Sequence, residues 1–172
     1  PIDSCNLSTG IALQIIEAGE RIQAGMPAVE IAKAMEGIIP HCHASFILDT
    51  LEFMKAGGRC SAVVAFGANL LSLKPCIEVN NADGSMHVGK KYRGTLKKVL
   101  PQYVKDQLSQ YPNIKRDHLF ITYSTIDPSY VELVRKAVEQ EMDFREIHVT
   151  TASCTIASHC GPNTLGILFE TE

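Results

Sequence analysis

The chain has 172 residues, of which 45% are hydrophobic and 20% charged, and its formal net charge at pH 7 is -3. This is the composition of a folded globular domain, so extensive disorder is excluded. The weak negative charge argues against bulk nucleic acid or an anionic membrane surface as the main partner, and no apolar run approaches the roughly 18 residues that span a bilayer. We therefore predict a soluble, cytoplasmic protein in which residues 1–172 form a single domain.

The first part of the chain, residues 6–75, is predicted to be mostly helical. Apolar residues recur at helical spacing after two candidate caps, Ser8 and Thr9, and Gly25 provides a stop. The predicted elements are a helix at 7–22, a second helix from Pro27 that bends or ends near Pro40, a strand at 45–49, a short helix at 51–55 closed by Gly57-Gly58, and a helix at 63–73 that is apolar all round and therefore buried.

The second part, residues 76–172, alternates strands and helices. The predicted elements are a hairpin of strands 76–80 and 86–90, a helix at 96–108 kinked at Pro101, a strand at 119–123, a helix that starts at Asp127-Pro128, a strand around 147–149, a short helix at 155–159 and a last strand at 164–169. This order indicates an α/β fold of the α+β-like kind, a mixed β-sheet flanked by helices. The pattern does not fix the strand order.

Two groups of residues could carry metal or thiol chemistry. His41-Cys42-His43 offers three ligand types, but on a strand only the two histidines share a face, so we predict no metal site there. Cys160 follows His159 at a helix end, and an enzyme that uses Cys160 or Cys154 as nucleophile is one alternative reading. Adjacent residues seldom form a nucleophile–base pair, and six scattered cysteines are typical of free, mostly buried thiols.

Two basic features could bind anions. Lysines and arginines cluster at residues 90–98, where cations next to a helix N-terminus oppose the helix dipole. The cluster includes Arg93 and hints at an anionic partner; a regulatory nucleic-acid-binding domain is the second alternative, weakened because Tyr92 is the only interleaved aromatic residue. Arg59, after Gly57-Gly58, is placed to bind a carboxylate or phosphate, or to form a structural ion pair. Nucleotide-binding and hydrolase motifs are absent, so we predict no cofactor.

Several short motifs in this order resemble the DegV family. They are Asp3-Ser4 with Leu7-Ser8-Thr9-Gly10, the run DTLEFMKAGGR at 49–59, Leu73-Lys74-Pro75, Lys91-Tyr92-Arg93-Gly94, and HCGPNTLG at 159–166. The resemblance covers the whole chain, and the second and last motifs are its most specific parts. It implies the C-terminal domain of a two-domain α/β protein that holds one long-chain fatty acid, such as palmitate, in a buried tunnel.

The resemblance also implies roles for three residues and a partner. Family members bind the acyl carboxylate through hydroxyl groups of the N-terminal domain and a histidine that corresponds to His159. Some present that carboxylate to a fatty acid kinase, with an arginine that corresponds to Arg93 near the pocket mouth; Arg59 belongs to the same surroundings. This implies a carrier without catalytic machinery of its own. The N-terminal domain is absent here, and the start at Pro1 suggests a piece of a longer protein.

Overall fold

A mixed six-stranded sheet organises the computed structural model, which describes residues 1–59 and 73–172. The strands are β1 (Cys42–Ile47), β2 (Leu73–Val79), β3 (Met86–Arg93), β4 (Ile114–Tyr123), β5 (Glu146–Thr151) and β6 (Leu165–Thr171). Their order across the sheet is β3-β2-β1-β6-β4-β5. Only β4 and β5 are parallel neighbours; the other four pairs are antiparallel. The predicted mixed sheet flanked by helices is confirmed.

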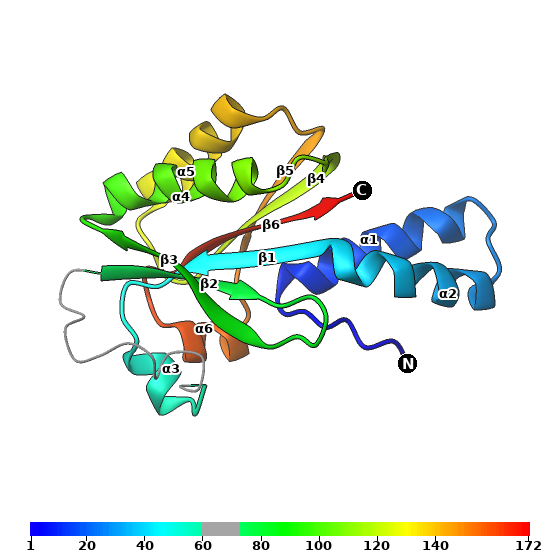
Figure 1. The fold of residues 1–172 in the computed structure, drawn as a ribbon, viewed down its shortest axis with the longest axis horizontal. Coiled ribbons are helices and arrows are strands. Elements are labelled where there is room, and N and C mark those ends of the chain that lie inside the picture. Colours follow the sequence, from blue (N-terminus) through cyan, green and yellow to red (C-terminus); the bar gives the residue numbers. More distant parts are fainter. Residues whose placement is uncertain (60–72) are drawn as a thin grey trace.

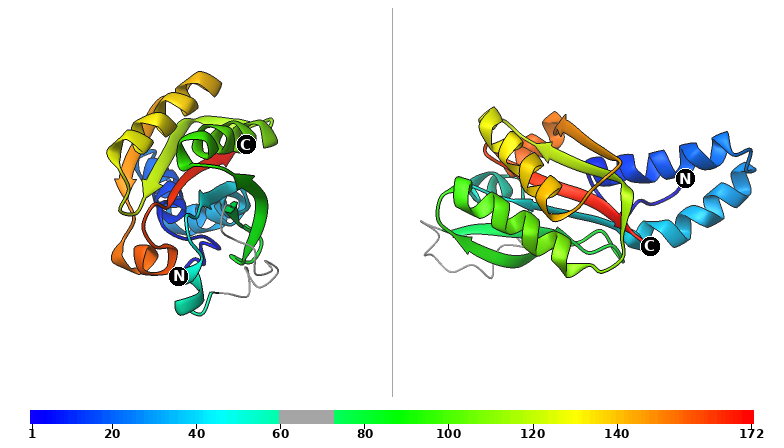
Figure 2. Two further views of the ribbon diagram at one scale, coloured as in Figure 1. Left: turned by 90° about the vertical axis from the view of Figure 1, so that its left-hand side faces the viewer. Right: turned by 90° about the horizontal axis from the view of Figure 1, so that it is seen from above.

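Helices cover both faces of this sheet (Figure 1). They are α1 (Thr9–Gln23), α2 (Ala28–Ile38), α3 (Glu52–Ala56), α4 (Leu96–Gln110), α5 (Pro128–Glu141) and α6 (Cys154–Cys160), with a 3-10 turn, η1, at Ile39–His41. Figure 2 shows α4 and α5 side by side on one face, and α1, α3 and α6 on the other. In the same views α1 and α2 form a hairpin that projects beyond one end of the sheet.

The middle strands β1 and β6 are buried on both faces, which explains why β6 is apolar over most of its length, whereas β1 also carries His43 and Ser45. Ile47 and Ile167 pack into the larger core beneath α4 and α5, whereas Leu168 joins the core beside α1. The fully buried Tyr103 of α4 is anchored to both strands: its hydroxyl donates to the Ser45 carbonyl at 2.8 Å and accepts from the Ile167 amide at 3.0 Å.

Several predicted boundaries need correction. The strand expected at 45–49 is β1, which begins at Cys42 because it pairs with β6 along its whole length. The hairpin is longer than predicted, since Leu73 pairs with Arg93. The helix expected at 96–108 continues through Pro101 to Gln110. The buried helix expected at 63–73 lies outside the described residues, except for Leu73, which begins β2.

Helix starts were predicted with mixed success. Asp127 caps α5 as expected, accepting a hydrogen bond from the Ser129 amide, and Pro128 is the first helical residue. Ser8 precedes α1 but makes no capping hydrogen bond with its side chain, because its backbone takes a φ of 52°. Pro27 is the N-cap of α2 rather than its first residue.

Candidate functional site

A narrow pocket lies between the sheet and the elements on its α1 and α6 face. It encloses about 380 Å³, including space open to solvent. It is lined by Leu7, Ser8, Ser45, Phe46, Thr122, Tyr123, Ser124, Ala152, Ile156, Cys160, Thr164, Gly166 and Leu168. Ile156 and Cys160 are one helical turn apart on α6, so both side chains face the pocket. We call this pocket the slot.

The hydroxyl groups around the slot are largely used within the protein. Ser45 Oγ lies 2.8 Å from the Tyr103 hydroxyl, and Thr122 Oγ1 lies 2.6 Å from that of Thr9. Ser124 donates to the Gly161 carbonyl, and Thr164 donates to the Cys160 carbonyl at 3.0 Å. Because these polar atoms are satisfied internally, the slot presents mainly carbon to a ligand.

A second, open and polar hollow lies at the end of the sheet where β3 meets α4. It is lined by Asp49, Lys74, Gly94, Thr95, Leu96, Tyr130 and Asn163. Lys74 forms an ion pair with Asp49, and Asn163 Nδ2 donates to the same carboxylate at 3.1 Å. Asn163 lines this hollow and its neighbour Thr164 lines the slot, so the loop before β6 borders both.

His159 is half-buried on α6 and faces α3 rather than the slot. A Cβ atom on Gly57 would fall 2.0 Å from the Nδ1 of His159, so the ring packs directly against this glycine. Among the described residues, Nδ1 is buried without a hydrogen-bond partner. The absence of a side chain on Gly57 therefore makes room for the ring, whose Nδ1 atom faces this glycine.

A second glycine contact joins the same two helices. A Cβ on Gly161 would fall 2.4 Å from the ring of Phe53 in α3. The two most specific sequence motifs, at 49–59 and 159–166, therefore meet in space through Gly57 against His159 and Phe53 against Gly161.

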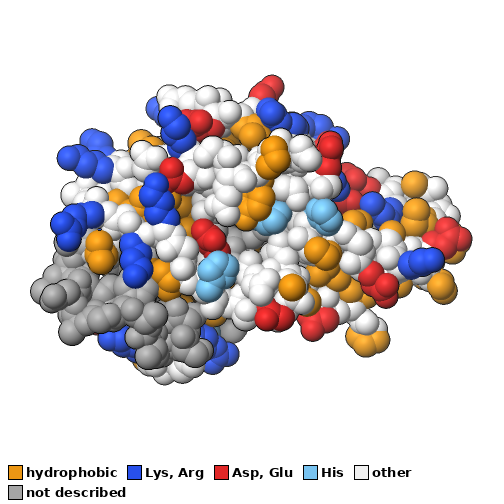
Figure 3. All heavy atoms as spheres, viewed as in Figure 1, with side chains coloured by type: hydrophobic (Ala, Val, Ile, Leu, Met, Phe, Trp, Pro, Cys, Tyr) orange, Lys and Arg blue, Asp and Glu red, His pale blue; other side chains and the backbone are white. Residues whose placement is uncertain are grey.

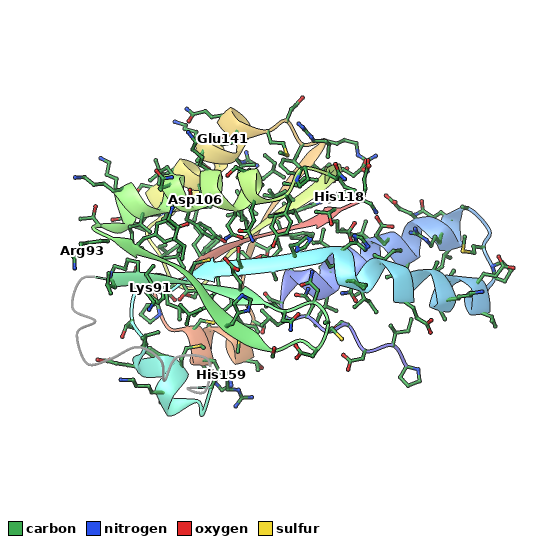
Figure 4. All side chains as sticks on the ribbon, viewed as in Figure 1. Lys91, Arg93, Asp106, His118, Glu141 and His159 are labelled. Atoms are coloured by element: carbon green, nitrogen blue, oxygen red, sulfur yellow. The ribbon has the colours of Figure 1, made fainter. Side chains whose placement is uncertain are left out.

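Arg93 and Arg59 are both exposed and lie apart from the slot lining. Arg93 ends β3 beside Gly94 and Thr95 of the polar hollow, and in Figure 4 it is well separated from His159. Arg59 donates to the Gly57 carbonyl at 2.8 Å. In Figure 3 basic side chains are frequent at this end of the molecule, whereas acidic and hydrophobic ones gather over the projecting α1–α2 hairpin.

One part of the basic cluster has a local function that the sequence did not reveal. Lys90 pairs with Asp106 of α4 at 2.7 Å and lies over the Tyr92 ring, while the Tyr92 hydroxyl donates to Asp106 at 2.8 Å. Lys90 therefore ties β3 to α4, so this member of the cluster has a stabilising partner within the chain.

The described cysteines are all free. Cys42, Cys76 and Cys160 are buried, and burial raises the pKa of Cys160 to about 11, which disfavours a reactive thiolate. Cys154 is exposed at the start of α6. Cys60 lies outside the described residues.

In the His41-Cys42-His43 triplet only Cys42 and His43 belong to β1, because His41 ends the 3-10 turn η1, but the two histidines still lie on one side. His41 and His43 both contact Thr171 Oγ1, at 3.3 and 3.1 Å, while the Cys42 thiol turns the other way towards Glu170. Sequence reasoning missed a different group, His118, Glu146 and His148, whose ligand atoms all lie within 4.8 Å of one another. The only signal was the alternation of Glu146 and His148 along one strand.

Sequence reasoning also missed the slot-lining hydroxyls. Ser45, Thr122 and Ser124 lie on or beside strands far apart in the chain, and only the pairing of β1, β6 and β4 brings them together.

Within the part of the chain that the structure describes, no helix is both long and apolar enough to cross a membrane.

Comparison with known proteins gives one consistent result. A family model described as an uncharacterised protein of the DegV family matches residues 1–172. A DegV domain-containing protein of Clostridium acetobutylicum is 28% identical, with 98% of this chain and 58% of the relative covered. One of Deinococcus radiodurans is 25% identical, with 98% and 59% covered. The chain thus spans less than two thirds of these relatives.

Solved structures agree with this fold. A fatty-acid-binding DegV family protein from Thermus thermophilus superposes with a TM-score of 0.86 at 26% identity, covering 99% of this chain and 60% of the other. The Fak B3 protein of the Streptococcus pneumoniae fatty acid kinase, loaded with linoleic acid, gives 0.81 at 17% identity, covering 99% and 59%.

Proposed function

The chain belongs to the DegV family, and from this premise we propose that it is the C-terminal, acyl-chain-binding domain of a fatty-acid carrier. In this proposal the slot receives part of a long-chain fatty acid such as palmitate, His159 contacts its carboxylate, and an exposed face presents the head group to a fatty acid kinase. The chain itself supplies binding and positioning, without catalytic machinery.

The character of the slot carries the proposal. Four of its hydroxyl groups, those of Ser45, Thr122, Ser124 and Thr164, are hydrogen-bonded within the protein, so most of its surface suits a hydrocarbon rather than a polar metabolite. A C16 acid has about 14 methylenes, and at ~0.8 kcal/mol each their complete burial is worth about 11 kcal/mol before binding costs. A slot open on one side gains only part of this.

The Thermus thermophilus relative supports the same ligand class, because it is a fatty-acid-binding protein with the same fold at 26% identity. The Streptococcus pneumoniae Fak B3 protein, which carries linoleic acid, motivates the kinase as partner. At 17% identity that second likeness concerns the fold, so the partner rests on the proposal alone.

The proposed role of His159 rests on its unused nitrogen. A carboxylate near an apolar tunnel needs hydrogen-bond donors, because an unpaired charge there is costly. The Nδ1 of His159 is buried, has no partner among the described residues, and is positioned by Gly57. A ligand carboxylate would give this nitrogen a partner.

The proposed docking face is the end of the sheet around Arg93 and Arg59. Both guanidinium groups are exposed, and Arg93 borders the polar hollow. Cations there can attract an acidic partner over a long range.

A further protein segment would complete the site. This chain covers less than two thirds of the Clostridium acetobutylicum and Deinococcus radiodurans relatives, and α1 exposes Ile11, Ile15 and Ile22 along one stripe, with Ile15 and Ile22 each 65% exposed. Apolar side chains gathered in this way are typical of a surface that another part of a protein covers. We assign the missing wall of the tunnel to that part.

The decisive experiment blocks the slot. We expect Ile156→Trp to fill it and to weaken palmitate binding by at least ~10-fold in the full-length protein, since several methylenes lose their burial. Val149→Trp adds the same ring at a strand position that is 39% exposed and outside the slot, and is the control. Binding would be followed by displacement of a fluorescent fatty acid. Equal affinities for the two variants would show that the acyl chain does not enter the slot.

A further inference from the structure

A group of histidine and carboxylate side chains lies at the β4–β5 edge of the sheet, away from the slot. His118 is opposite Glu146 in the parallel register, and His148 is two residues further along β5, so all three side chains reach the same face. They border an open hollow whose other wall is α1. In Figure 4 His118 lies far from both His159 and Arg93.

Two of the distances in this group are close to those of a metal site, and all three ligand atoms lie within 4.8 Å of one another. His118 Nδ1 lies 3.1 Å from His148 Nε2, which in turn lies 3.5 Å from Glu146 Oε2. Ligands at 2.0–2.1 Å from a tetrahedral zinc ion are separated by about 3.3–3.4 Å. A metal ion can therefore sit among these three atoms after small movements of the side chains.

We propose that His118, His148 and Glu146 form a binding site for a divalent transition-metal ion of the zinc type. Two imidazoles and one carboxylate favour zinc and its first-row neighbours over magnesium or calcium, which prefer oxygen ligands. The fourth position faces the hollow between β5 and α1, where water can complete the tetrahedron.

The surroundings fit this role. His148 stacks on Phe120, with ring centroids 4.5 Å apart and an interplanar angle of 24°, so its ring has a fixed orientation. Glu20 of α1 lies 3.7 Å from His118 Nε2 and can accept its proton when Nδ1 binds the metal.

Arg145 opposes the metal in the present arrangement. Its guanidinium nitrogen lies 3.2 Å from His118 Nε2, so it donates to the nitrogen that would carry the proton in the metal-bound tautomer. It also pairs with Asp117 at 3.2 Å, and its side chain is 57% exposed. Because it is exposed, Arg145 can turn towards Asp117 and leave His118 free to donate to Glu20.

The test is titration of the chelator-treated, full-length protein with zinc chloride against a chromophoric zinc indicator. We expect one zinc ion per chain at micromolar or tighter affinity, and losses of at least about 100-fold for His148→Ala and for Glu146→Gln. Glu146 is exposed, so Glu146→Gln tests the site without disturbing the core, and circular dichroism would verify folding of both variants. Arg145→Ala should bind several-fold more tightly, since it removes a competing cation.

Two controls address the other histidines. His87 pairs with Glu78 at 3.4 Å, and His41 shares Thr171 with His43; each offers a partial set of ligands elsewhere in the fold. His87→Gln and His41→Gln should bind zinc as the unmodified protein does. No binding below about 100 µM, or binding that His148→Ala and Glu146→Gln leave unchanged, would overturn the proposal. None of these outcomes depends on whether the slot binds fatty acids.

Discussion

Among the described residues, the ring of His159 is held by packing contacts, and its Nδ1 atom has no hydrogen-bond partner. It packs against Gly57 with Nδ1 buried, and Cys160 beside it faces the slot. A buried nitrogen without a hydrogen-bond partner lowers the stability of the folded protein unless a ligand forms a hydrogen bond with it. The proposed contact with a fatty-acid carboxylate gives a direct test of whether a ligand bonds to this ring.

His159→Ala in the full-length protein is expected to weaken palmitate binding by about 1–3 kcal/mol, because the carboxylate loses a donor. Binding of hexadecanol, which has no carboxylate, should change little. Both affinities can be measured by displacement of the same fluorescent probe. If the acid and the alcohol weaken equally, His159 is a structural residue.

A second set of charged residues, Glu17, Lys115 and Glu170, joins α1 to the sheet. Lys115 lies 2.8 Å from Glu17 and 3.5 Å from Glu170, and Glu170 is only 5% exposed. Burial and the neighbouring Glu17 raise the pKa of Glu170 to about 7. Burial alone would also raise the pKa of Glu17, but hydrogen bonds from Lys115, Glu170 and Arg21 outweigh it and lower that pKa to about 2.

These pKa values predict how Glu170→Gln changes stability with pH. Between pH 4.5 and about 7 the folded state keeps the Glu170 proton that the unfolded state has lost, so stability falls as pH rises through this window. Glutamine does not titrate. The variant should therefore gain about 1–3 kcal/mol relative to the unmodified chain between pH 5 and pH 8. Urea unfolding at the two pH values measures this gain, with the exposed Glu139→Gln as control; a difference independent of pH would contradict it.

At the scale of elements, the short helix α3 depends on its contact with α6. Five residues are too few to form a stable helix alone, so α3 is stabilised by packing. Its Met54 is buried, and Phe53 lies over Gly161, whose φ of 77° favours glycine. The Gly-Pro pair after α6 therefore ends that helix and also leaves space for α3.

Gly161→Ala is expected to destabilise the protein by about 1–3 kcal/mol for two reasons. The new methyl group would collide with the Phe53 ring, and the alanine would have to adopt a backbone conformation with positive φ that is unfavourable for it. Gly37→Ala is the matched control: nothing lies within 4 Å of its Cβ position, and it is inside α2. That change should be neutral or stabilising by up to about 1 kcal/mol. Denaturant unfolding measures the free energy of unfolding of both variants. Equal changes would show that the α3–α6 contact contributes nothing to stability.

At the scale of the whole molecule, three regions with different chemistry are separated. The slot lies beneath the sheet, the basic end surrounds Arg93, and the histidine group is at the β4–β5 edge (Figure 4). The rigid sheet joins them, so a substitution at one region should leave the others intact when the fold is preserved.

Arg93→Ala in the full-length protein should leave palmitate binding nearly unchanged and impair acyl-phosphate formation with the cognate kinase. An exposed charge mainly affects the rate at which the protein associates with the kinase. Low salt screens this attraction less and so speeds association of the unmodified protein more than that of Arg93→Ala, and the difference in acyl-phosphate formation should therefore grow as salt is lowered. The rate of acyl-phosphate formation at two ionic strengths measures this, with Lys136→Ala on the exposed side of α5 as control. Lost palmitate binding with normal kinase coupling would reverse the roles proposed for Arg93 and His159.

Most element types and the family could be predicted from the amino-acid sequence alone. Apolar periodicity and the Asp127-Pro128 start located α1, α5 and the last strand, since these signals are local and act over a few residues. It also singled out the motifs at 49–59 and 159–166. It did not predict that β1 lies in the middle of the sheet, because strand pairing is a long-range property.

Which side chains meet depends on the packing of the folded chain and could not be predicted from the sequence. Residues 118 and 146 are far apart in sequence, and the parallel register of β4 and β5 alone brings His118 to Glu146 and His148. Likewise, the His159 ring contacts Gly57 only because α3 packs on α6. Periodicity encodes which face of an element is buried, but distances between groups depend on register and packing, which many weak contacts fix together.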